Sequence, residues 1–435
     1  MFKRIFTLFL GVFIIGLFLF SLKLYDHRYM VLAFINGCIC WYGLFSHDQQ
    51  PFSVHKMNLI FILFFFVLAN ASQYASDTLV STLYVLLSPR DYLSFQVLVL
   101  FIICLYILMY ELLFKRVRPL SFAGFRDRQA DVLFLIIISF VATLIVLYHY
   151  RNNLPLLFVR GVEGVYHDAS DDTNVASSLL FSKLLRPIPF ACLIWSLVYK
   201  CSRRVKMALF SMTLISMFPT SLARYAMVLY WLPVALLLFP QLYRRNFLVS
   251  LFIFGLLFVF PFLGNFRYYS GALSFRFSFD YLNTLNYDAS QEFMILMNYD
   301  LVTYGKQLLG AMFFFIPRSF WPGKPIGSGA TLASLQPGAW TNISMPFIAE
   351  GYINFGVVGI FIFTIVLALL AALCDKTYWY APDLNHRKSF APFYFVLVGI
   401  SIFFMRGDLM SSFSFLVAAM ADLWIVRAVA FNKIK

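Results

Sequence analysis

The sequence predicts an all-α polytopic membrane protein that forms a single integral membrane domain over residues 1–435. The chain is 61% hydrophobic and 20% aromatic, and only 12% of its residues are charged. A soluble domain carries about 25% charged residues, so this composition leaves too little polar surface for a water-soluble fold. The mean hydropathy of +0.80 agrees, because most of the chain is then needed for membrane-spanning helices.

Apolar stretches predict about twelve transmembrane helices. We expect them to centre on residues 5–22, 30–46, 57–73, 93–114, 130–149, 188–199, 207–219, 222–240, 247–265, 354–374, 391–405 and 410–428. The first apolar run has a basic start but no small-residue cleavage site, so we expect a span rather than a removed signal. An even number of spans places both termini on the same side of the membrane.

The basic residues fall in short hydrophilic gaps, chiefly within 115–128, 200–206 and 244–245. Short loops rich in Lys and Arg mark the cytoplasmic side of a membrane, so we expect both termini to be cytoplasmic. Two long loops, 150–187 and 266–353, then lie on the opposite side. The net charge of +14 is explained by these anchors, and we expect no nucleic-acid binding.

Several familiar chemistries have no signal in this chain. There is no P-loop motif, no dinucleotide-binding glycine motif after a strand and no HExxH motif. None of the six His residues is paired at metal-ligand spacing. We therefore expect no metal and no cofactor. The six Cys residues fall in spans or near the inner face, so no disulfide framework is expected in the long loops.

The first half of the 266–353 loop combines cations, aromatic residues and a helix signal. Arg267 and Arg276 stand among Tyr and Phe residues, a pattern typical of interface anchors. Asp288 with Gln291 resembles a capping box, and Glu292 lies in the first turn of the helix that this box would open. The apolar stripe of this helix is Phe293, Leu296, Met297, Leu301 and Tyr304. It predicts an amphipathic helix on the membrane surface, so the loop is partly helical.

The later part of the same loop contains "IPRSFWPGKP", residues 316–325. Three prolines restrict the backbone, and Arg318 and Lys324 lie between them. A rigidly held pair of cations favours an anionic phosphate ligand, which Arg can bind with two parallel hydrogen bonds. Preorganisation by proline lowers the entropy that binding would cost. This stretch is therefore the strongest candidate for a functional site.

Together with the following "AEGYINFGVVG" segment, this stretch resembles the bacterial O-antigen (Wzy-type) repeat-unit polymerase family. Members carry a similar proline-rich element, then an acidic residue, here Glu350, and an Asn-Phe-Gly start to the next span, here 354–356. The segments "SLARY" around Arg224 and "MRGDLMSS" around Arg406 also resemble the family. The resemblance covers the topology and about 90 residues of the second half.

The family's periplasmic loops also show an Arg-x10-Gly pattern. Arg318 and Gly329 fit this spacing, whereas Arg151 and Gly161 in the first long loop are one residue too close. We therefore do not carry the family's loop role to Arg151 or Arg160.

The resemblance implies a glycosyltransferase of the bacterial inner membrane, with two large periplasmic loops. The donor would be a glycan chain on undecaprenyl pyrophosphate, and the acceptor a single repeat unit on the same carrier. The acceptor hydroxyl would attack C1 of the donor's reducing-end sugar, and the lipid pyrophosphate would leave. No nucleotide sugar is needed, and a separate chain-length regulator is an implied partner. Capsule or exopolysaccharide is as compatible with this reaction as O-antigen.

The implied site combines cations for the pyrophosphate with a proton acceptor. We expect catalytic roles for Arg318, Glu350 and Glu292. We expect substrate binding by Arg224, Arg267, Arg276, Lys324 and Arg406. The acids considered as proton acceptor are Asp280, Asp288, Glu292, Glu350 and Asp408, together with His167. Asp288 is expected to cap a helix and Asp408 to pair with Arg406, which favours Glu350. An ion pair with one of the arginines is the alternative role for Glu350.

Two other functions fit a protein of this class. An O-antigen ligase would share the topology and chemistry, but it would be expected to carry a His in the late periplasmic loop. Residues 266–353 contain none. A polysaccharide flippase or other transporter would need ionisable residues inside its spans. Asp422, near the end of the last expected span, is the exception among predominantly apolar spans.

Overall fold

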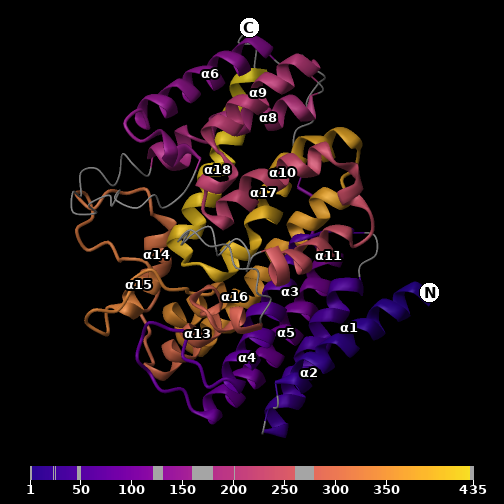
Figure 1. The fold of residues 1–435 in the computed structure, drawn as a ribbon, viewed down its shortest axis with the longest axis vertical. Coiled ribbons are helices and arrows are strands. Elements are labelled where there is room, and N and C mark those ends of the chain that lie inside the picture. The colour runs from indigo at the N-terminus through magenta and orange to yellow at the C-terminus, as the bar shows by residue number, and fades with distance from the viewer. Residues whose placement is uncertain are drawn as a thin grey trace.

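The computed structural model describes most of the chain, and the described part is helical with no strands. It covers residues 2–22, 24, 26–46, 50–120, 131–158, 180–199, 201–259 and 279–431. Eight of its helices are long and apolar enough to cross a membrane. A polytopic helical membrane protein is therefore confirmed. Helices α13, α14 and α15 lie on the left of the view in Figure 1, and the N-terminus lies on the right.

The eight long apolar segments account for eight of the predicted spans. They are α2 (His27–Ser46), α3 with η1 and α4 (Val54–Ala75), α5 (Pro89–Arg116), α6 (Val132–His149), η3 with α8 (Phe181–Val198), α16 (Phe347–Trp379), α17 (Leu384–Arg406) and α18 (Leu409–Phe431). Three shorter apolar helices fall on further predicted spans: α1 (Phe2–Ser21), α10 (Arg224–Leu238) and α11 with η6 (Phe247–Val259). The remaining prediction, 207–219, falls on α9 (Arg203–Ser216), which is not among these apolar helices.

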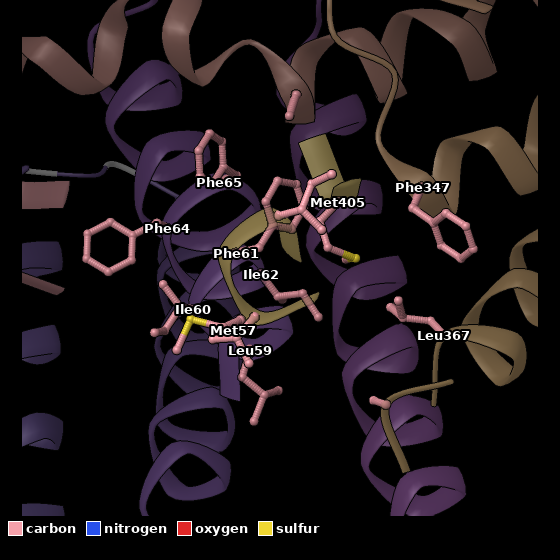
Figure 2. Close-up of a cluster of buried hydrophobic side chains, with 14 of the residues drawn as sticks. Met57, Leu59, Ile60, Phe61, Ile62, Phe64, Phe65, Phe347, Leu367 and Met405 are labelled. Atoms are coloured by element: carbon pink, nitrogen blue, oxygen red, sulfur yellow. The ribbon is translucent and has the colours of Figure 1, made fainter. Parts of the chain in front are cut away.

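The segment Val54–Ala75 is the central helix of the bundle, and its apolar window is 94% buried. Ser53 caps its start by accepting a hydrogen bond from the Lys56 backbone N–H. Its middle, Ile62–Leu68, is a π-helix of bulky apolar residues. Figure 2 shows side chains from this helix gathered with Phe347 of α16 and Met405 of α17. A helix that is apolar all round must be enclosed by neighbours, and this one is.

Polar side chains also hold the central helix in place. At one end, Asp375 of α16 accepts hydrogen bonds from the backbone N–H groups of Val54 and His55, at 2.9 and 3.2 Å. The hydroxyls of Tyr110 and Tyr394 also donate to it, at 3.0 and 2.7 Å. One buried carboxylate thus joins α16, α3, α5 and α17. Asp375 was not predicted as a structural residue, because it lies just beyond the predicted 354–374 span.

Helix α16 is two helices joined by a sharp reversal. Phe355 (φ −141°, ψ 18°) and Gly356 (φ 62°, ψ −149°) leave helical geometry, and the positive φ of Gly356 favours glycine. The rings of Phe347 and Phe363 are 5.1 Å apart. In a continuous helix these residues would be about 24 Å apart along the axis, so residues 347–354 fold back against the second half.

Two glycines permit the halves of α16 to touch. A Cβ atom on Gly351 would meet the backbone carbonyl of Gly359, and a Cβ atom on Gly359 would meet the carbonyl of Gly351. The Asn-Phe-Gly segment predicted to begin a span is therefore the turn, and the apolar helix after it runs to Trp379.

Helix α13 (Ala289–Asn298) corrects a prediction. It does not lie on a membrane surface: residues 289–296 are all buried, and α13 packs against η1, α4, α5 and α16. The predicted capping box is also wrong, because Asp288 makes no side-chain cap hydrogen bond. Gln291 instead accepts hydrogen bonds from the backbone N–H groups of Val80 and Ser81, at 2.8 and 3.2 Å.

The rest of the described loop contains short helices, as predicted for a partly helical loop. These are η7 (Phe279–Asn283), η8 (Leu285–Tyr287), α14 (Lys306–Met312) and α15 (Ser328–Ala333). Elsewhere the described chain has η2 (Leu154–Leu157), η4 (Pro219–Ser221) and η5 (Pro240–Tyr243).

We predict that Gly351→Ala prevents the halves of α16 from packing, because the new methyl group would overlap the Gly359 carbonyl. The measurement is the folded yield and melting temperature in detergent, and both should fall sharply. The matched control is Gly255→Ala in η6, where a Cβ atom meets nothing within 4 Å. This control should be neutral or slightly stabilising. Equal behaviour of the two variants would contradict the hairpin.

Candidate functional site

The candidate site forms where α13, α14, α15 and the first half of α16 meet the turn between α17 and α18 (Figure 1). That turn contains Arg406, Gly407 and Asp408. Arg406 contacts Asp288, directly before α13, on one side of it, and Asp408 contacts α15 on the other. The turn is thus the common neighbour of the two groups of acids described below.

Arg406 pairs with Asp288, not with Asp408 as predicted. Its Nη2 donates to Oδ1 of Asp288 at 2.9 Å and to the backbone carbonyl of Leu285 at 2.8 Å. The Asp288 side chain is only 3% exposed. It also accepts from the Ser344 hydroxyl at 2.5 Å and the Ser344 N–H at 3.2 Å. Asp288 therefore binds Arg406 and Ser344, and it does not cap α13.

Glu292 lies one helical turn beyond Asp288 and is fully buried. Neither carboxyl oxygen has a hydrogen-bond partner of normal geometry among the described residues, although the Ser81 side chain is close enough to oppose a rise of the Glu292 pKa. Burial, together with the nearby Asp288 carboxylate, raises the pKa of Glu292 to about 8. The side chain is therefore mainly protonated and neutral at pH 7.

Glu350 is buried on the short first half of α16. Its Oε2 accepts from the Ser328 hydroxyl at 2.7 Å, and its Oε1 accepts from the Leu409 backbone N–H at 2.8 Å. Among the described residues no arginine is hydrogen-bonded to Glu350, and its alternative role as an arginine partner stays a prediction, because Arg267 and Arg276 lie outside the described residues.

Asp408 is held beside Glu350. It accepts from the Gly329 backbone N–H at 3.0 Å and from the Ser411 N–H at 3.2 Å. Burial raises the pKa of Asp408, while these backbone hydrogen bonds oppose the rise. Gly327 is needed here, because a Cβ atom on it would overlap the Asp408 carboxylate. Two acidic side chains thus meet the first residues of α15 and α18, whose backbone N–H groups donate hydrogen bonds to them.

The prolines and cations of residues 316–325 form a self-bonded loop. Arg318 donates through Nη1 to the Lys324 carbonyl at 2.6 Å and through Nη2 to the Pro325 carbonyl at 3.2 Å. Lys324 Nζ donates to the carbonyls of Phe314 and Ile316, at 2.5 and 2.9 Å. Burial and the nearby Arg318 lower the pKa of Lys324. The rigidity that the sequence predicts from proline thus comes from both cations as well.

This loop packs against α18 next to the acidic pair. The Phe314 and Phe413 rings are 6.1 Å apart, and a Cβ atom on Gly310 would meet Pro325 and Met410. The Arg318 side chain stays exposed. An exposed guanidinium on a fixed loop can still present its remaining N–H groups to an anion.

Of the other predicted binding residues, only Arg224 lies in the described chain. It begins α10 and donates through Nη1 to the Tyr281 hydroxyl at 2.8 Å. Tyr281 and Tyr287 are in edge contact at 5.7 Å, which places Arg224 on the Asp288 side of the site. Arg267, Arg276 and the alternative base His167 lie outside the described residues.

Two cations that were not predicted as site residues, Lys183 and Arg186, are hydrogen-bonded within the bundle. Lys183 donates to the Ser414 hydroxyl of α18 at 2.6 Å and lies 4.2 Å from the centre of the Phe415 ring. Arg186 donates through Nε to the Ser216 carbonyl at 2.6 Å and through Nη2 to the Ser221 hydroxyl at 2.9 Å. The sequence pattern that could have predicted them is this pair of cations directly before the sixth predicted span, 188–199.

Within the described ranges, no group of three or more His, Cys, Asp or Glu residues could hold a metal ion. The arrangement instead offers acids and cations in hydrogen-bonded positions. Such a set can bind anionic groups and move protons. Comparisons of the chain with protein-family models, curated proteins and solved structures give no match.

We predict that Glu292 makes stability depend on pH. Its pKa is raised from 4.5 to about 8 in the folded protein, so its stabilising contribution is full below about pH 4.5 and is lost as pH rises to about 8. The melting temperature of the wild type should fall across that window more steeply than that of Glu292→Gln, which cannot titrate. Glu292→Asp should retain a pH dependence. Parallel profiles for wild type and Glu292→Gln would contradict the burial argument.

Proposed function

We propose that this chain is a membrane glycosyltransferase that joins oligosaccharide repeat units carried on undecaprenyl pyrophosphate. It would transfer a growing glycan onto a single lipid-linked unit and release undecaprenyl pyrophosphate. This is the reaction implied by its resemblance to O-antigen (Wzy-type) polymerases. The product is O-antigen, or a related capsular or exopolysaccharide chain.

The observation that carries the proposal is the meeting of two acidic residues with a rigid cationic loop. Glu350 and Asp408 lie where α15 and α18 begin; Phe314, just before the 316–325 loop, packs on Phe413 of α18, and Pro325 of the loop and Met410 of α18 both lie against Gly310. These elements contain the residues that resemble the family. A polymerase needs cations for a pyrophosphate leaving group and an acid–base group for the acceptor hydroxyl, and both are present here.

The proposed roles follow from exposure and bonding. Arg318 is exposed and binds the pyrophosphate, while Lys324 holds the loop that presents it. Glu350, with Ser328 on one oxygen, accepts the proton of the attacking hydroxyl. Glu292 and Glu350 are both buried, but only Glu350 is oriented by hydrogen bonds, from Ser328 and Leu409, so we assign Glu292 a positioning role beside Asp288 and Arg406.

The proposed membrane arrangement keeps the finer sequence predictions. Twelve helices cross the bacterial inner membrane, both termini are cytoplasmic, and the loops 150–187 and 266–353 face the periplasm. The pyrophosphate is tied to lipid, so its site must lie at a membrane face. A separate chain-length regulator is a proposed partner, and no cofactor is required.

The test of the proposed function is deletion of the gene in its host, followed by gel analysis of surface lipopolysaccharide. Loss of a polymerase leaves a single repeat unit on the lipid A core. Loss of a ligase leaves no repeat unit, and loss of a flippase leaves none and traps lipid-linked units in the cytoplasmic leaflet. A complete ladder of long chains in the deletion strain would refute the O-antigen reading and direct the test to capsule and exopolysaccharide.

We predict that Arg318→Lys lowers polymerisation by purified protein at least about tenfold, the effect of one lost strong hydrogen bond. A lysine cannot reach the carbonyls of Lys324 and Pro325 with a planar fork and still face a phosphate. The measurement is chain formation from purified lipid-linked repeat units. Ser319→Ala, at the exposed neighbouring position, is the control and should be active. Full activity of Arg318→Lys would show that polymerisation does not need the two parallel hydrogen bonds of a guanidinium.

A further inference from the structure

A second polar cluster lies in the interior of the helix bundle, away from the candidate site. Four helices contribute one residue each: Ser139 from α6, Cys192 from α8, Tyr230 from α10 and Asp422 from α18. All four are at least 95% buried. These helices lie together in the upper half of the view in Figure 1. Asp422 is 14 residues beyond Asp408, which is about 20 Å along the helix.

Helix α8 packs against each of the other three helices and so holds the four together. The Trp195 side chain of α8 donates to the Leu423 carbonyl of α18 at 2.8 Å, beside Asp422. The Phe190 ring of α8 makes edge contact with the Tyr230 ring at 5.1 Å. The Asp422 carboxylate is close enough to Tyr230 and Cys192 to interact electrostatically with both, and Ser139 lies beside Cys192.

Three oxygens of this cluster lack a normal hydrogen bond among the described residues. Asp422 Oδ2 and the Tyr230 hydroxyl are buried and have no hydrogen-bond partner among the described residues, and the buried Ser139 hydroxyl has only the neighbouring Cys192 thiol beside it. Buried polar groups in proteins are normally hydrogen-bonded, and those inside a membrane bundle normally mark a functional site. Three buried oxygens without a normal hydrogen bond, on three neighbouring helices, make this part of the bundle the candidate for a further ligand.

The chemistry of the cluster selects the ligand. A carboxylate and two hydroxyls are hard oxygen donors, which suit Na⁺, Mg²⁺ or Ca²⁺ better than a soft metal. There is one carboxylate, so a monovalent ion leaves the site neutral, whereas a divalent ion leaves a buried positive charge. Arg186, which acts electrostatically on Tyr230, and Arg427, 5.7 Å from the Trp195 ring, make a divalent ion still less favourable.

We propose that Asp422, Tyr230 and Ser139 form an intramembrane binding site for a small monovalent cation, with Na⁺ as the ligand. Bound Na⁺ contacts the carboxylate and both hydroxyls and ties α18 to α6 and α10. The site joins the far half of α18 to its neighbours, so it stabilises the helix whose first turns contact the acidic pair. The proposal is independent of the proposed glycosyltransferase function.

The test is the melting temperature of the purified full chain in nanodiscs as NaCl replaces choline chloride or KCl at constant ionic strength. The wild type should gain stability with a saturable dependence on Na⁺, and Asp422→Asn should lose that response. Tyr230→Phe, which keeps the ring, should raise the half-maximal Na⁺ concentration at least about tenfold. The matched control is Ser401→Ala on α17, because the Ser401 hydroxyl already donates to the Leu397 carbonyl at 2.6 Å. Its Na⁺ response should be unchanged.

Two outcomes would overturn the site. One is a wild-type melting temperature that is the same in Na⁺, K⁺ and choline. The other is a response that follows pH equally in all three salts, because Asp422 then takes a proton and no metal ion. If Asp422→Asn fails to fold, the test rests on Tyr230→Phe. An Na⁺ midpoint of Tyr230→Phe equal to that of the wild type refutes the proposal.

Discussion

The candidate site depends on the reversal of α16 at Phe355 and Gly356. A continuous helix would place Glu350 far from α18, whereas the turn brings it against the Leu409 N–H. The reversal leaves the last carbonyls of the short half without helical partners, and the preceding loop supplies them. The N–H of Thr303 donates to the Ile353 carbonyl at 2.7 Å, and the N–H of Gly305 donates to the Asn354 carbonyl at 3.0 Å. One turn therefore orients a carboxylate and anchors the start of the loop.

The same physical constraint shapes the rest of the bundle. A chain with 12% charged residues that packs mainly apolar side chains must give each buried charge a partner, or keep it neutral. Asp375 meets that demand with four donors at one end of the central helix. Asp288 meets it with Arg406 and Ser344 at the site. Glu292 has no such partner among the described residues and is mainly neutral at pH 7, which follows from the rise of its pKa to about 8.

Hydropathy predicted the helices well because a span is a local property of about twenty residues. The Asn354–Gly356 boundary was also local, and the structure places the break there. The contacts of the site were not predictable in this way. Asp288 and Arg406 are 118 residues apart, and no local pattern pairs them. The apolar stripe of α13 predicted a helix on the membrane surface, which is wrong. A helix face that is buried against other helices has the same apolar pattern, so the sequence does not distinguish the two.

Arg318 and Lys324 have different roles in the 316–325 loop. Lys324 has three N–H donors and uses two on the carbonyls of Phe314 and Ile316, so its main effect is to hold the loop closed. Arg318 has five N–H donors and uses two on the Lys324 and Pro325 carbonyls, so three remain. A guanidinium can thus fix the backbone and bind an anion with the same planar group. An ammonium that made the same two bonds would keep one N–H donor, which is too few for a two-bond contact with a phosphate. The division follows from donor number and geometry, and it makes Arg318 the member of the pair through which the loop would act on a phosphate.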